Sequence, residues 1–95
     1  MAITHCTIQK SGPAASSEEY FAAARQLTGA AFKLYIYFDC ITNPVGQYTR
    51  AKTVDILKLS RHTLDAAFNE LCKRGYLQLN DNDVYIFLTK VKETT

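Results

Sequence analysis

The stretch T-V-D-I-L-K-L-S-R-H-T-L-D-A-A-F-N-E-L-C-K-R-G-Y-L, from Thr53 to Leu77, decides the fold of this chain. Its pattern predicts two helices joined by a tight turn, followed by a glycine stop and a strand. Ser60 is a good N-cap, because its hydroxyl can accept a backbone N–H that the first helical turn leaves unpaired. Gly75 can end the second helix in a left-handed conformation. The stretch predicts a helix-turn-helix with residues 60–74 as the recognition helix, an element that usually lies in a DNA major groove.

Both helices of the motif have an expected inward face. In the recognition helix the apolar positions at helical spacing are Leu64, Ala67, Phe68 and Leu71. The first helix is expected to be capped by Thr49, and its inward residues are expected to be Ala51, Val54 and Leu57. Between the helices, Lys58 holds the turn position that Gly or Asn usually takes. Lys58 must therefore adopt a left-handed backbone, at a cost of about 1 kcal/mol.

The segments on either side extend the motif to a winged helix-turn-helix. Tyr76–Leu79 and Val84–Leu88 are β-prone runs, and the Asn and Asp residues between them favour a hairpin turn. Ahead of the motif, Thr28 can cap a helix that runs to about Thr42, and residues 43–46 break it. The predicted fold is α+β, a three-helix core with a C-terminal β-hairpin wing.

The N-terminal third adds further elements. Residues 1–16 are expected to form an arm, and residues 17–95 the winged domain with a preceding short helix. Ser16 and Glu19 have the spacing of a capping box at the start of that helix. Its inward residues are expected to be Tyr20, Phe21, Ala24 and Leu27. Within the arm, Ile3, Cys6 and Ile8 among threonines predict an edge strand.

Several runs of the chain resemble one known family, over roughly residues 27–90. They are L-T-G-A-A-F-K-L-Y-I-Y-F (Leu27–Phe38), Tyr48, L-S-R-H-T-L (Leu59–Leu64), E-L-C-K-R-G-Y-L (Glu70–Leu77) and Y-I-F-L (Tyr85–Leu88). These runs are similar to small winged-helix proteins of bacteria, plasmids and phages. Replication initiators and DnaD-type primosome proteins begin with such a domain. The resemblance implies the fold, but the biological role stays open because transcription regulators use the same scaffold.

Composition limits the classes of function. Ninety-five residues make one domain with a net charge of +2. The three cysteines have no close pair spacing and no secretory leader precedes them, so a reduced cytoplasmic setting is expected, with Cys40 and Cys72 filling core space. No apolar run is long enough to span a bilayer. No metal-ligand spacing, phosphate loop or nucleophile motif stands out, so neither a metal, a cofactor nor catalysis is expected.

The charges favour the motif as a binding site for double-stranded DNA. Between Tyr48 and Tyr76 there are six basic residues against three acidic ones. Arg can bind guanine, Asn adenine, and Asp the cytosine amino group, whereas the basic residues of the first helix suit phosphates. The candidate DNA-binding residues are Arg50, Lys52, Lys58, Ser60, Arg61, His62, Asp65, Asn69 and Lys73. For Ser60 the structural role as a cap comes first. The alternative is that these residues form a solvated helix surface.

Two features leave other roles open. Asp81 and Asp83 at the wing tip would face phosphates, so we expect the wing to stand off the DNA or to contact protein. The apolar character of residues 28–42 on nearly all sides, and of Val84–Leu88 on both faces, favours a homodimer over a monomer. The expected function is non-catalytic DNA binding in transcription regulation or as a replication accessory. The alternative is a protein-interaction module, working with a replication or regulatory partner such as an initiator.

Overall fold

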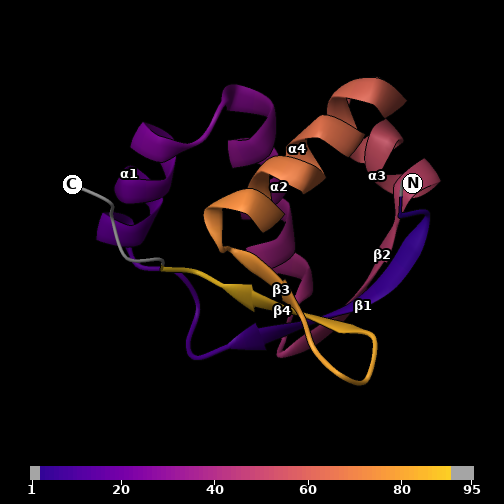
Figure 1. The fold of residues 1–95 in the computed structure, drawn as a ribbon. Coiled ribbons are helices and arrows are strands. Elements are labelled where there is room, and N and C mark those ends of the chain that lie inside the picture. Colours follow the sequence, from indigo (N-terminus) through magenta and orange to yellow (C-terminus); the bar gives the residue numbers. More distant parts are fainter. Residues whose placement is uncertain (1–2, 91–95) are drawn as a thin grey trace.

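A computed structural model describes residues 3–90 of the chain. The fold is α+β, with four helices on one face of a four-stranded mixed sheet (Figure 1). In chain order the elements are β1 (His5–Ser11), α1 (Ser17–Gln26), α2 (Gly29–Ile41), β2 (Val45–Thr49), α3 (Arg50–Leu57), α4 (Arg61–Arg74), β3 (Leu77–Leu79) and β4 (Val84–Leu88).

The sheet is larger than the sequence predicts. Its strand order is β2-β1-β4-β3, with β1 antiparallel to β2 and parallel to β4. The edge-strand prediction for the N-terminal arm is wrong, because β1 lies between two neighbours. Strand β2 was not predicted, since its first two residues, Val45 and Gly46, lie within the expected helix break at 43–46. The predicted hairpin is present as β3 and β4, but it is one half of this sheet.

The central place of β4 accounts for its apolar sequence. It lies between β1 and β3, so both of its backbone edges are paired. Phe87 is fully buried beneath the helices, and Tyr85 beside it packs edge-on against Phe68 at a centroid distance of 5.2 Å. Ile86 and Leu88 face the other side of the sheet and are half-buried. The central position of β4 therefore explains most of its apolar character on both faces, without a second copy of the chain.

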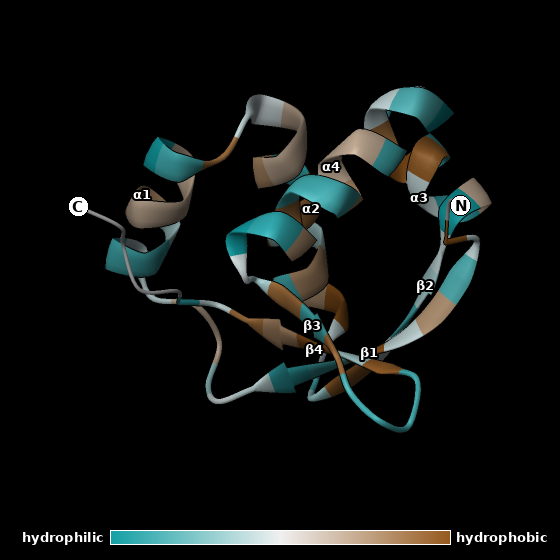
Figure 2. Cartoon of the chain, viewed as in Figure 1, coloured by the Kyte–Doolittle hydropathy of each residue, from teal (hydrophilic) through white to brown (hydrophobic). Residues whose placement is uncertain are grey.

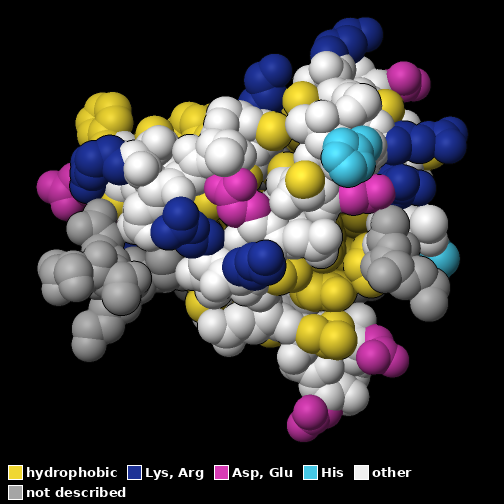
Figure 3. All heavy atoms as spheres, turned by 45° about the horizontal axis from the view of Figure 1, so that its top comes forward, with side chains coloured by type: hydrophobic (Ala, Val, Ile, Leu, Met, Phe, Trp, Pro, Cys, Tyr) yellow, Lys and Arg dark blue, Asp and Glu magenta, His cyan; other side chains and the backbone are white. Residues whose placement is uncertain are grey.

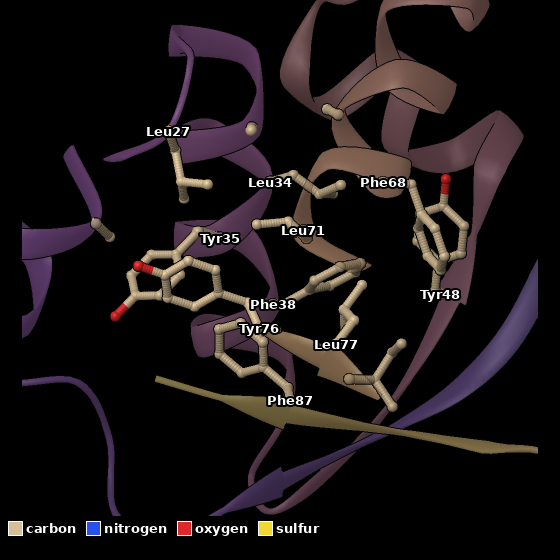
Figure 4. Packing of buried hydrophobic residues seen from close by; sticks show 14 of the residues in the cluster. Leu27, Leu34, Tyr35, Phe38, Tyr48, Phe68, Leu71, Tyr76, Leu77 and Phe87 are labelled. Carbon is tan, nitrogen blue, oxygen red and sulfur yellow. The ribbon is translucent and has the colours of Figure 1, made fainter. Parts of the chain in front are cut away.

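Helix α2 forms the middle of the core (Figures 2 and 4). The ring of Tyr35 lies 5.4 Å from those of Tyr76 and Phe87, and its hydroxyl donates a hydrogen bond of 2.6 Å to the Thr89 carbonyl oxygen. Phe38 meets Phe68 of α4 edge-on at 6.1 Å. As predicted, α2 is capped by Thr28 and ends at Thr42. These contacts hold α2 against the sheet, and α4 packs on α2.

Helix α1 docks differently from the prediction. The capping box of Ser16 and Glu19 is confirmed. Ala23 and Leu27 are buried, but Phe21 is 65% exposed and Ala24 is exposed too, so that part of the inward face was wrong. Tyr20 of the same helix instead donates a hydrogen bond from its hydroxyl to the Asp39 carboxylate of α2, at 2.6 Å.

A polar anchor is formed by Asp39 and its three hydrogen-bond donors. The Asp39 carboxylate accepts from Lys10 at 2.8 Å, from the Tyr20 hydroxyl at 2.6 Å and from the Ala15 amide at 3.2 Å. The side chains of Lys10 and Asp39 are only 8% and 5% exposed. Because the donors come from β1, the linker after it and α1, one buried carboxylate ties the N-terminal third to α2.

The cysteines only partly follow the prediction. Cys72 is half-buried, and burial raises the pKa of its thiol. Burial, with Cys72 nearby, raises the pKa of Cys6 to about 11. Cys40 is exposed, so its assignment to the core was wrong. All three thiols are free.

Candidate nucleic-acid interface

The connection between α3 and α4 has the predicted turn. Lys58 ends α3 in the left-handed region, with φ 57° and ψ 44°. The Ser60 hydroxyl accepts from the Thr63 amide at 3.1 Å, and Gly75 ends α4 with φ 89°. The predicted bounds of this helix, residues 60–74 with Ser60 as the N-cap, are thereby confirmed.

Helix α3 corrects two details of the prediction. It starts directly after Thr49, but the Thr49 side chain makes no capping hydrogen bond. Instead, the Thr53 hydroxyl donates a hydrogen bond of 2.8 Å to the backbone carbonyl oxygen of Thr49. Ala51 is exposed, and Thr53 is the fully buried residue of this helix. A hydroxyl satisfied by its own backbone can replace an apolar side chain on an inward face.

Helix α4 buries the predicted face. Leu64, Ala67, Phe68 and Leu71 are at most 4% exposed. Phe68 contacts Tyr48 of β2 at a centroid distance of 5.2 Å. The opposite face is exposed, and it carries Arg61, His62, Ala66, Asn69 and Lys73. Figure 3 is turned toward this side of the molecule and shows a histidine among basic and acidic groups.

Two of the candidate DNA-binding residues bind each other. Arg50 of α3 donates from Nε to Asp65 Oδ1 at 2.9 Å and from Nη2 to Oδ2 at 2.6 Å. Both side chains are 24% exposed. A guanidinium and a carboxylate in this two-point geometry hold each other's orientation. Asp65 therefore uses both oxygens inside the protein, and Arg50 is held at the α3–α4 junction.

Glu70, the other acidic residue of α4, also has an internal partner. Its carboxylate accepts from the Thr28 amide at 2.8 Å and from the Thr28 hydroxyl at 3.0 Å. Thr28 is the N-cap of α2, where a negative charge is favourable to the helix dipole. This pairing spans 42 residues, and the helical pattern alone gives no sign of it.

The basic side chains of the motif are mostly left open to solvent. Among residues 3–90, no ion-pair partner of Lys52, Lys58, Arg61, Lys73 or Arg74 is present, and all five are exposed. Both carboxylates of α4 point to internal partners, whereas its basic groups do not. The structure thus leaves a more positive outer face than the sequence count of charges suggests.

The hairpin tip is acidic and lies away from this face. Asn80 folds the turn by accepting from the amides of Asn82 at 2.9 Å and Val84 at 3.0 Å. Asp83 adopts φ 60°, and both Asp81 and Asp83 are exposed. In Figure 3 the two acidic groups of the tip project at the bottom of the view.

A hollow of about 510 Å³ lies between α4 and the corner that joins α1 to α2. Gln26 and Thr28 line it on the corner side, and Asn69, Lys73 and Arg74 line it on the α4 side. Sequence reasoning assigned Asn69 and Lys73 to the site but missed Gln26, Thr28 and Arg74 as neighbours. The Lys73-Arg74 pair was the one signal in the sequence that pointed here.

Comparisons with models of protein families, with curated proteins and with solved structures found no match to this chain. Within residues 3–90 no helix has the length and apolar character needed to cross a membrane. The same residues contain no group of three or more His, Cys, Asp or Glu side chains that could hold a metal ion.

Proposed function

We propose that the chain is a winged helix-turn-helix domain that binds double-stranded DNA without catalysis, through the exposed face of α4. One observation carries the proposal. Asp65 and Glu70, the two acidic residues of α4, are bound by Arg50 and Thr28, while Arg61 at its start is exposed and has no ion-pair partner among the described residues. An exposed polar helix with its acidic groups tied inward suits the negative potential of a duplex.

The residues divide into three roles. Arg61, His62 and Asn69 are placed to meet base edges, since side chains near the start of a recognition helix reach deepest into the major groove. Lys52 and Lys58 are placed for phosphates, which position the protein without specifying sequence.

The third role is positioning. Arg50 and Asp65 hold α4 against α3 and do not themselves contact DNA. Ser60 fixes the first turn of α4 through its hydrogen bond with Thr63. In this assignment the acidic hairpin tip stands off the duplex.

The resemblance to small winged-helix proteins supports a role as a transcription regulator or a replication accessory factor in the cytoplasm. Protein interaction is a second candidate function, because a mainly apolar hollow of about 450 Å³ lies between α2 and α3. Ile36, 37% exposed, and Ile56, 51% exposed, are part of its lining. Such a surface suits a regulatory or replication protein as partner.

A homodimer is part of the proposal, since two-fold DNA binders pair their recognition helices across two half-sites. Sedimentation equilibrium of the free protein, and of the protein with a duplex, tests it. One chain in the free protein and one chain per duplex in the complex would contradict the dimer and leave DNA binding by a monomer.

Fluorescence anisotropy of a labelled random duplex tests the proposed function. We expect Arg61→Ala to lower the affinity about tenfold at moderate salt, because it removes an exposed charge at the start of α4, on the proposed DNA face. Lys33→Ala is the matched control, since Lys33 is an exposed cation of α2 beside the α2–α3 hollow. Equal affinities for the two variants would place the contact elsewhere, and no binding by the natural chain would reject the function.

A further inference from the structure

We propose that the hollow between α4 and the α1–α2 corner is a seat for a phosphate of the DNA backbone. The inference rests on the proposed function and deepens it, because it places the second side of the protein–DNA contact on helix α1. The sequence offered no reason to include α1 in the interface.

The charge around the hollow favours an anion. Lys73 and Arg74 line it, and neither has an ion-pair partner among the described residues. The one carboxylate in the lining is that of Glu70, whose two oxygens accept hydrogen bonds from Thr28. Two open cations against one bound carboxylate leave a positive surplus where the hollow faces solvent.

The position of the hollow favours DNA as the source of that phosphate. Asn69 and Lys73 belong both to the exposed row of α4 and to the lining of the hollow. A helix that lies in the major groove has a phosphate backbone along each side of it. The strand on the α1 side would pass over this hollow while Arg61 and His62 face the bases.

Gln26, which lines the hollow, also carries a donor without a partner. The Nε2 nitrogen of Gln26 is buried and has no hydrogen-bond partner. Buried amide nitrogens are nearly always paired, so one without a partner beside an open hollow calls for an acceptor. Rotation of the terminal amide toward the hollow would let Nε2 donate to a phosphate oxygen.

The test is duplex binding across a salt series for two variants of the hollow. Arg74→Gln removes one cation, and we expect it to lower the affinity about fivefold and to reduce the magnitude of the salt slope by about 1. Gln26→Glu places a negative charge in the wall, and we expect a loss of about tenfold. Gln9→Glu, the same change on the exposed outer face of β1, is the control and is expected to leave affinity unchanged.

The outcomes separate the two proposals. If Arg61→Ala lowers affinity while Arg74→Gln and Gln26→Glu do not, the phosphate seat is wrong and DNA binding by α4 stands. If the natural chain binds no duplex at low salt, both proposals are wrong as stated. Circular dichroism of each variant checks folding, and Arg74→Gln, at an exposed position, decides the matter even if Gln26→Glu unfolds.

Discussion

Arg50 and Asp65 are joined by two hydrogen bonds, 2.9 Å from Nε to Oδ1 and 2.6 Å from Nη2 to Oδ2. The pair links the first residue of α3 to the second turn of α4. A planar guanidinium that binds a carboxylate at two points restrains rotation as well as distance. The angle between the two helices of the motif is therefore set by an ion pair in addition to the apolar contacts beneath it.

A double-mutant cycle tests this link. We expect Arg50→Ala and Asp65→Ala each to lower the free energy of unfolding, and the two to be coupled by about 1 kcal/mol, as suits a two-point pair at a partly exposed site. Urea unfolding of the single and double variants gives the value. Additive effects of the two substitutions would show that the pair contributes no interaction energy.

The sequence predicted the turn between α3 and α4 and the bounds of α4 because the signals for them are local. Ser60, Gly75 and the apolar spacing of α4 act within a few residues of one another, and the structure follows them. Even the unusual left-handed Lys58 was predictable, because the turn requires that conformation whatever residue occupies it.

The sheet and half of the site depend on contacts between distant residues. Strand β1 pairs with β4, more than 70 positions away in the sequence. Nothing in the sequence of either strand indicates which strand it pairs with. Likewise Arg50 binds Asp65, and Glu70 binds Thr28, at separations that helical periodicity does not connect. Residues that look like open charges in a sequence can therefore be structural pairs.

The buried pair of Lys10 and Asp39 gives a prediction for the N-terminal third. Asp39→Asn leaves the Lys10 ammonium buried without its counter-charge, so we expect a loss of about 3 kcal/mol in the free energy of unfolding at pH 7. The double variant Lys10→Met with Asp39→Leu removes both charges and should lose less. Urea unfolding measures the loss of stability in the single and in the double variant. Equal losses would show that the unpaired Lys10 charge is not what destabilises Asp39→Asn.

The same carboxyl predicts a pH dependence. Burial alone raises the pKa of Asp39, but hydrogen bonds from Lys10, Tyr20 and the Ala15 amide outweigh it and leave the pKa below its usual value. A group with a lowered pKa stabilises the fold above its unfolded pKa of about 3.9 and loses that contribution as pH falls through the folded value. The difference in stability between the natural chain and Asp39→Asn should thus be constant above about pH 5 and shrink below about pH 4. A difference that stays constant down to pH 2 would contradict it.

Replacement by Ala should change stability in opposite directions at Gly46 and Gly29. A Cβ at Gly46 would meet the backbone carbonyl of Ile41, with the carbonyl carbon at 2.9 Å, so Gly46→Ala should destabilise by about 2 kcal/mol or more. A Cβ at Gly29, in the first turn of α2, has open space around it. Gly29→Ala should raise stability by about 0.5 kcal/mol through the lower entropy of the unfolded chain. Thermal unfolding of both variants checks the opposite signs, and a shift in the same direction would contradict the fold at β2.

Tyr48 can be replaced by Phe without loss of stability, according to its surroundings. Its side chain is 1% exposed, and its hydroxyl has no hydrogen-bond partner. Tyr48→Phe keeps the ring that packs on Phe38 and Phe68 while it removes an unsatisfied buried oxygen. We expect the free energy of unfolding to stay unchanged or to rise by up to about 1 kcal/mol. The melting temperature should therefore stay level or rise. A fall would mean that the hydroxyl is bonded in solution.

The most direct measurement is a titration of unlabelled duplex into the ¹⁵N-labelled protein, followed by amide chemical shifts. We expect the largest changes at Arg61, His62 and Asn69, with a second group around Gln26 and Thr28, and none on the outer face of β1. Changes confined to that outer face, or no changes with the duplex in excess at low salt, would contradict DNA recognition by α4.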